Sequence, residues 1–153
     1  MNNLIQVILL SMAPISELRG AIPLGILAYH MNATLVTIVS IISNMVPAIG
    51  IIMLFDSILP WVKKRFPSIG RFVERFSQTR KEKNRKRIER YGLLAIIAFV
   101  AIPFPLTGAW TGSLLTVLFE MPKFKSIIAV AIGVTIAGMI VTLSILLGTN
   151  NLY

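Results

Sequence analysis

The sequence contains no cysteine and a single histidine, His30. The absence of cysteine excludes disulfide frameworks and thiolate metal sites. An imidazole metal site or a Ser-His-Asp triad would have to depend on that one histidine. We therefore expect no metal, no cofactor and no catalytic residues, since a credible pairing of nucleophile and base is missing.

Acidic residues are also scarce, with 6 Asp and Glu against 15 Lys and Arg, which gives a net charge of +9. Residues 63–90 hold 12 of the 15 basic residues. Basic blocks bind nucleic acid in some proteins, but this block lies between two strongly apolar halves. The positive-inside rule favours a cytoplasmic loop that contacts an anionic leaflet, with no nucleic-acid partner.

What the sequence has in excess is apolar side chains, at 56% of 153 residues. Soluble domains usually contain about 45–50%, so the excess must face lipid. We predict an all-α integral membrane protein of the plasma or inner membrane, with residues 1–153 as a single membrane domain. Met1 begins an apolar run without a basic segment before it, so we expect no cleavable signal peptide.

The first half, residues 1–60, contains a polar break inside an apolar stretch. Each apolar arm has about 12 residues and spans about 18 Å as a helix, against about 30 Å of hydrocarbon. Broken backbone is tolerated at membrane depth where protein or a cavity surrounds it. We predict a re-entrant hairpin over residues 4–30 with its tip at residues 14–23, and a spanning helix over 34–59 that Pro47 kinks.

The second half, residues 91–148, has the same order of elements: a hairpin over 92–120, broken at 103–112, and a spanning helix over 126–148. A shift of 88 residues places Leu-Arg-Gly-Ala at 18–21 on Leu-Thr-Gly-Ala at 106–109. The linker, residues 61–90, contains apolar residues at helical spacing. Its amphipathic part lies on the membrane surface or packs under the protein.

The charge distribution predicts the topology. With residues 61–90 in the cytoplasm, the first spanning helix runs from outside to inside. If each hairpin returns to the side it left, the first enters from outside and the second from inside, and Lys123 and Lys125 are cytoplasmic. If each of these segments instead crossed the membrane fully, as one span, the lysines would be outside. We therefore predict an inverted repeat of hairpin plus transmembrane helix, with the site at the midplane.

Glu17 and Arg19, in the first break, are the strongest candidates for function. Ionisable groups at membrane depth are costly, rare and usually functional. Arginine offers a bidentate fork that fits phosphate or carboxylate, and a carboxyl group can take up and release a proton. We interpret them as an anion-binding and a proton-coupling residue. The alternative is a structural ion pair that stabilises the hairpin tip.

The second break carries no charge and offers hydroxyls, an indole N–H, glycines and prolines. Half-helix N-termini near such breaks present free N–H groups to anions. On the first spanning helix, an asparagine lines the cavity or makes an interhelical hydrogen bond. The predicted binding residues are Glu17, Arg19, Gly20, Pro23, Asn44, Pro103, Pro105, Thr107, Gly108, Trp110 and Thr111.

Residues 16–25 (SELRGAIPLG) and 103–112 (PFPLTGAWTG) together resemble the small multidrug export protein family, which is distantly similar to the DedA superfamily. The DedA resemblance implies opposed re-entrant helices, homo-oligomers, translocation of undecaprenyl phosphate or phospholipids, and essential acidic and arginine residues. Glu17 and Arg19 match its first region. In the second region, Thr107 and Trp110 stand where DedA-like chains often carry another arginine.

The first hypothesis is a small transporter or lipid flippase, proton-linked, that moves an anionic lipid or a small anionic or amphipathic substrate. The alternative is a non-transporting assembly or insertase-like factor that acts through the basic linker. A monomer with two spanning helices and two hairpins would bury Glu17 and Arg19 poorly. We therefore expect a homodimer or larger homo-oligomer in contact with membrane lipids.

Overall fold

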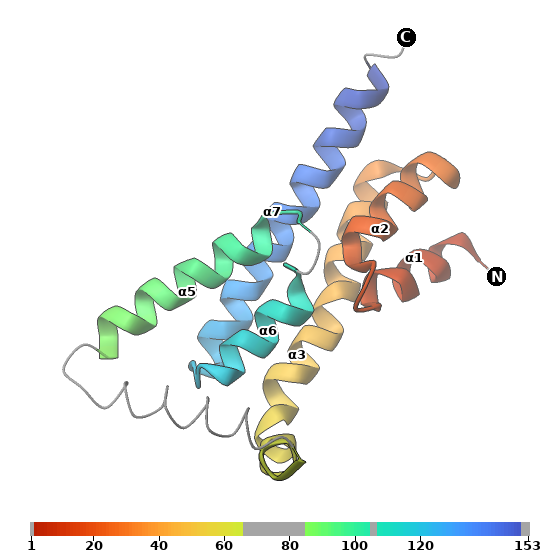
Figure 1. Ribbon diagram of the computed structural model, residues 1–153. Helices are drawn as coiled ribbons and strands as arrows, with labels where there is room; N and C mark the ends of the chain where they lie inside the picture. Colours follow the sequence, from red (N-terminus) through yellow and green to blue (C-terminus); the bar gives the residue numbers. More distant parts are fainter. Residues whose placement is uncertain (1, 66–84, 105–106, 151–153) are drawn as a thin grey trace.

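The computed structural model describes residues 2–65, 85–104 and 107–150, and all the regular elements in these ranges are helical (Figure 1). Two of the helices are long and apolar enough to cross a membrane, over Ala33–Leu54 and Lys123–Thr149. The prediction of an all-helical protein is confirmed for these residues. Both spans fall where the sequence predicts them.

The first half forms four elements. They are α1 (Asn3–Met12), α2 (Glu17–Pro23), the π-helical turn η1 (Leu24–Ala28) and α3 (Ala33–Arg65). Asn2 caps α1, because its side-chain oxygen accepts a hydrogen bond from the N–H of Leu4 at 3.4 Å. The helix ends at Met12, and the backbone of the next residue, Ala13, is extended with ψ 139°, as the following proline requires.

Proline at position 23 is the last residue of α2, and the chain continues from it into η1. Proline lacks an N–H, so the hydrogen-bond ladder loses one bond at this position. The wider turn places the N–H of Tyr29 at 3.1 Å from the carbonyl of Leu24. Pro23 therefore lies within the returning arm of the hairpin, and the non-helical part of the break is confined to residues 13–16.

The second half forms α5 (Arg85–Ala101), α6 (Ala109–Leu118) and α7 (Lys123–Asn150). The chain leaves α5 just before Pro103, which cannot continue the helical ladder. Gly108 precedes α6 in an extended conformation with φ −121° and ψ −168°. The uncharged break thus lies between two helix ends, a C-terminus and an N-terminus.

Several bounds differ from the sequence predictions. The helix predicted over 34–59 continues to Arg65 and passes through Pro47 as one element. The helix predicted over 126–148 is longer by three residues at its start and two at its end. Residues 85–90 of the linker are helical. The linker residues 66–84, with most of the expected amphipathic segment, lie outside the described residues.

The hairpins pack across the two halves. α1 lies against α3 and α5 against α7, while α2 also contacts α7 and α6 contacts α3. In Figure 1, α3 and α7 run in opposite directions, and the tips of the two hairpins meet near the middle of the molecule. The buried apolar core crosses this meeting point and includes Val7, Leu18, Val36, Val100 and Val134.

Apolar side chains also cover the outside of the long helices. On α3 the exposed residues include Leu35, Ile38, Ile42, Val46, Ile49 and Met53; on α7 they include Ile128, Ile132, Ile136, Met139, Leu143 and Leu147. Their spacing of three and four places each set on one helix face. Monomeric soluble proteins rarely expose such continuous apolar patches, so these faces fit a lipid surrounding.

Candidate functional site

Glu17 lies in the first break and forms hydrogen bonds with the backbone of the second break. It is 5% exposed and begins α2 with a positive φ of 48°, a conformation that non-glycine residues seldom adopt. Its carboxylate accepts hydrogen bonds from the N–H groups of Ala109 at 3.3 Å and Trp110 at 3.2 Å. These are orphan donors in the first turn of α6. Glu17 therefore caps a helix that lies about ninety residues further along the chain.

Gly108 makes this cap possible. A Cβ atom at this position would overlap both carboxylate oxygens of Glu17. Any side chain here would push the carboxyl group away from the helix end. The predicted role of Gly108 as a site residue thus has a specific physical basis, the close approach of a charged side chain to the backbone.

Arg19, also in the first break, binds the second break on its other side, where α5 ends. Its Nη1 donates to the carbonyl of Phe104, and its Nη2 to the carbonyls of Thr107, Ile102 at 3.0 Å and Val100 at 3.3 Å. Helix α5 ends at Ala101, so these acceptors include the orphan carbonyls of its last turn. A cation at a helix C-terminus is also favoured by the helix dipole.

Trp110 supplies a third connection. Its indole N–H donates to the carbonyl of Met12 at 3.1 Å, at the C-terminal end of α1. The side chains of Glu17, Arg19 and Trp110, with these backbone partners, form what we call the clasp. Glu17 and Arg19 both bind the backbone of the second break. The carboxylate of Glu17 lies at the N-terminus of α6, and the guanidinium of Arg19 lies at the C-terminus of α5.

The tip pocket is a cavity of about 380 Å³ beside the clasp, lined by Pro14, Ile15, Ser16, Glu17, Arg19, Gly20, Pro103, Phe104, Gly108 and Thr111. Both breaks contribute to it. Ile15 is 97% exposed and Phe104 65%, so apolar side chains border its opening. The charged groups of Glu17 and Arg19 share the cavity with them, an arrangement that fits an amphipathic ligand.

The tip pocket brings together six of the residues predicted from the sequence: Glu17, Arg19, Gly20, Pro103, Gly108 and Thr111. Thr107 instead holds the loop, with its hydroxyl at 2.8 Å from the carbonyls of Ile102 and Phe104. Trp110 belongs to the clasp, and Pro23 ends α2. Pro105 lies outside the described residues.

Asn44 is fully buried on α3, beside the carboxyl group of Glu17. Neither its Nδ2 nor its Oδ1 has a hydrogen-bond partner of regular geometry, although the amide interacts with the carboxyl group of Glu17. The sequence left two roles open for this residue, a cavity lining or an interhelical hydrogen bond. Its amide stays available to a group that enters beside Glu17.

Several contributors could not be recognised from side-chain chemistry. The carbonyls of Met12, Val100 and Ile102 act through the backbone, which every residue carries. Pro14, Ile15, Ser16 and Phe104 line the tip pocket but have no special chemistry in sequence. One signal in the sequence pointed to this contact between the breaks. The shift of 88 residues places Arg19 on Thr107, whose carbonyl accepts a hydrogen bond from Arg19.

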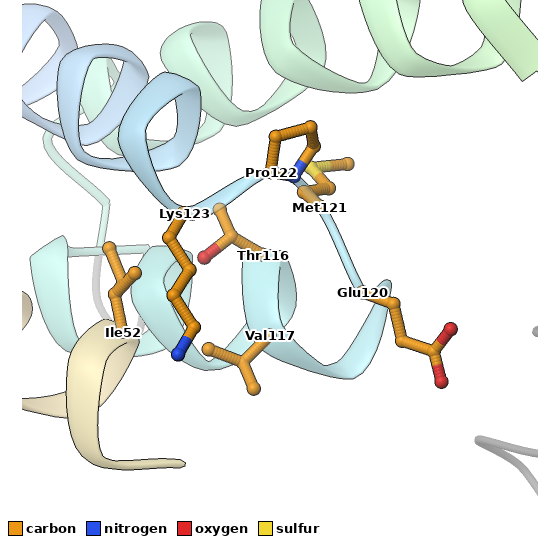
Figure 2. A pocket seen from close by; sticks show the side chains of 7 residues that line it. All are labelled: Ile52, Thr116, Val117, Glu120, Met121, Pro122 and Lys123. Atoms are coloured by element: carbon orange, nitrogen blue, oxygen red, sulfur yellow. The ribbon is translucent and has the colours of Figure 1, made fainter. Parts of the chain in front are cut away.

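A second cavity of about 350 Å³ lies between the end of α6 and the start of α7, and we call it the α6–α7 pocket. No sequence pattern predicted it. In Figure 2, the chain of Lys123 extends past Thr116 on the side of Ile52, whereas Glu120 points the other way. The lining residues are Ile52, Thr116, Val117, Glu120, Met121, Pro122 and Lys123.

The model of a family described as "Putative small multi-drug export protein" matches residues 17–140. The match begins at Glu17 and contains the three side chains of the clasp, Glu17, Arg19 and Trp110. The chain belongs to this family. No curated protein and no solved structure matches it. The family resemblance drawn from the two motifs is thereby confirmed, and the family description indicates an export protein of the membrane rather than an enzyme.

Proposed function

We propose that this member of the export family moves an anionic or amphipathic substrate, such as a lipid with an acidic headgroup, across the cell membrane through the tip pocket. One observation carries the proposal. The two charged residues of the first break border an open cavity and at the same time hold the helix ends of the second break. A ligand that competes for them acts directly on the contact between the halves.

The competition has a physical basis. In the clasp, the Nη atoms of Arg19 are engaged by carbonyls, and an anion in the tip pocket offers them stronger, charge-assisted hydrogen bonds. Protonation of Glu17 would remove the negative charge that caps α6. Anion binding and proton uptake therefore both loosen the clasp. A ligand shifts a conformational equilibrium by its differential affinity for the two states, so the shared clasp couples the two events.

We also propose that the two hairpins are re-entrant and that the halves form an inverted repeat. α1 and α6 have 10 residues each, or about 15 Å, half of a hydrocarbon core of about 30 Å. The packing is reciprocal, with α2 on α7 and α6 on α3. His30 and Glu120 both have positive φ, and each lies three residues before a long helix.

The homo-oligomer expected from the sequence remains a prediction. Its premise was that one chain buries Glu17 and Arg19 poorly. Within a single chain Glu17 is 5% exposed, whereas Arg19 is only partly buried. The exposed apolar rows on α3 and α7 leave room for either lipid or a second copy. Crosslinking in native membranes decides between them, since a strictly monomeric pattern contradicts the expectation.

The proposal is tested with purified protein in liposomes that carry a pH gradient. The probe is a fluorescent phosphatidylglycerol, with fluorescent phosphatidylcholine as the zwitterionic comparison. Glu17→Gln and Arg19→Gln should each slow phosphatidylglycerol movement at least tenfold, because each removes one charge of the clasp. Lys125→Gln removes an exposed charge at the start of α7 and should leave the rate unchanged.

Unchanged movement in folded Glu17→Gln and Arg19→Gln protein would refute the transport function. The alternative of an assembly or insertase-like factor predicts a different result. Deletion of residues 66–79 would then abolish the cellular phenotype while lipid movement in liposomes persists.

A further inference from the structure

The α6–α7 pocket lies one helix length away from the clasp. α6 begins at Ala109, whose N–H bonds Glu17, and its seventh residue after that, Thr116, lines the α6–α7 pocket. Seven residues of helix advance about 10 Å. The two cavities therefore lie at opposite ends of the same short helix, with Glu17 at one end.

A buried polar face of α6 connects them. Ala109, Gly112, Ser113 and Thr116 are the buried residues of this helix, and their spacing of three and four places them on one face. Ser113 is 0% exposed and its hydroxyl has no hydrogen-bond partner. Thr116 is 1% exposed, and its hydroxyl donates to the carbonyl of Ser113 at 2.8 Å.

The facing side of α3 has matching residues. Asn44, Ala48 and Ile52 are buried at intervals of four residues and share one face. Asn44 lies beside Glu17, and Ile52 lines the α6–α7 pocket with Thr116. In Figure 1, α3 and α6 descend in the same direction. Ala48 lies between Asn44 and Ile52 on this face of α3, and therefore between Glu17 and the α6–α7 pocket.

Buried polar atoms in folded proteins are almost always hydrogen-bonded to protein or to ordered water. The hydroxyl of Ser113 lacks a protein partner although it is fully buried, and the buried amide of Asn44 has only its interaction with Glu17, which is not a hydrogen bond of regular geometry. Ser113 shares the buried face of α6 with Thr116, and Asn44 lies beside Glu17. Water molecules that enter from the α6–α7 pocket would supply the missing hydrogen-bond partners, one after another, between Thr116 and Glu17.

We propose that the α6–α7 pocket is the mouth of a narrow water path that reaches Glu17 along Thr116, Ser113 and Asn44. The proposal rests on the proposed function, because it gives the proton-coupling residue a second access. Glu17 meets one side of the membrane through the tip pocket and the other through this path. A hydronium ion arriving along it gives its proton to the carboxylate and remains as water; the reverse step returns the proton.

The charged groups around the path are few among the described residues. Arg19 lies at the Glu17 end, and Glu120 and Lys123 line the mouth. The lysine chain beside Thr116 (Figure 2) places a cation near the entrance.

Silver ions test the path, since Ag⁺ is small, travels with water and reacts with thiols. The chain has no native cysteine, so Ser113→Cys carries a single thiol. Ag⁺ is added from either side of oriented membrane vesicles, and the remaining thiol is counted with a fluorescent maleimide after unfolding. Ala137→Cys, at a position 1% exposed in the apolar core, is the matched control.

Ser113→Cys should react at least tenfold faster than Ala137→Cys, and only from the side on which α7 begins. Adding Thr116→Leu should slow the reaction about as far as the control, whereas Thr116→Ser should preserve it. Equal rates for the two cysteines overturn the water path. A reactive Ser113→Cys in a protein whose lipid movement survives Glu17→Gln leaves the path standing and refutes the proposed function instead.

Discussion

Arg19 donates a hydrogen bond to the backbone carbonyl of Thr107, the residue 88 positions further along the chain. The same shift of 88 residues superimposes the two breaks in sequence. When two halves are related by a two-fold axis, a residue can touch its own equivalent only near that axis. The bond therefore places the proposed axis at the clasp.

Gly108→Ala should weaken the clasp without changing a charge. The added Cβ displaces the carboxylate of Glu17, so two backbone N–H groups of α6 lose their acceptor. A buried donor left unsatisfied costs about 1–3 kcal/mol, and the expected result is a clearly lower Tm in detergent with slower lipid movement.

Gly50→Ala is the matched control for this substitution. A Cβ at Gly50 meets nothing within 4 Å, and alanine is favoured over glycine in a helix by about 1 kcal/mol. The control should unfold at the same or a higher temperature. If both variants unfold alike, the contact between Gly108 and Glu17 does not hold the clasp.

Arg19→Lys should fail to replace arginine even though it keeps the charge. The guanidinium spreads its donors over four carbonyls, whereas an ammonium group is a compact point charge. We expect lipid movement to fall about tenfold and the loop around Thr107 to become sensitive to protease. Wild-type rates in Arg19→Lys would show that charge alone is required and would remove the role of the fork.

Trp110→Phe and Tyr29→Phe separate a bond between the halves from a bond within one half. Trp110 bonds Met12 across the breaks, and Tyr29 bonds Gln6 inside the first half. Each variant loses one hydrogen bond, worth about 1 kcal/mol, so both should lower stability to a similar degree. Only Trp110→Phe should also change transport, and equal transport in the two variants would argue against the clasp as the moving contact.

The sequence was informative where physical chemistry leaves few choices. Prolines at 14 and 103 stop α1 and α5, and the apolar lengths define the two spanning helices. Glu17 and Arg19 were recognisable because charge is rare at membrane depth. Their partners were not predictable in the same way. A carbonyl such as that of Ile102 becomes an acceptor only through the tertiary approach of the other half, and no side chain marks it.

The alternative of an ion pair between Glu17 and Arg19 also shows that the partners of a charged side chain are hard to predict from sequence. Two opposite charges two residues apart suggest each other as partners, yet each bonds the backbone of the second break. Helix ends carry several orphan donors or acceptors, so they compete well with a single charged side chain. The competition is decided by the packing of the hairpins, which no local pattern contains.

Cysteine labelling tests the inverted topology. Phe124 is 76% exposed at the start of α7, and His30 is exposed just before α3. In a chain without native cysteine, Phe124→Cys and His30→Cys each report one side to a membrane-impermeant maleimide. Re-entrant hairpins place position 124 in the cytoplasm and position 30 outside. If residues 92–120 instead cross the membrane once as a single span, position 124 becomes reactive from outside and both positions label from the same side. That result excludes the opposed hairpins on which the shared midplane site depends.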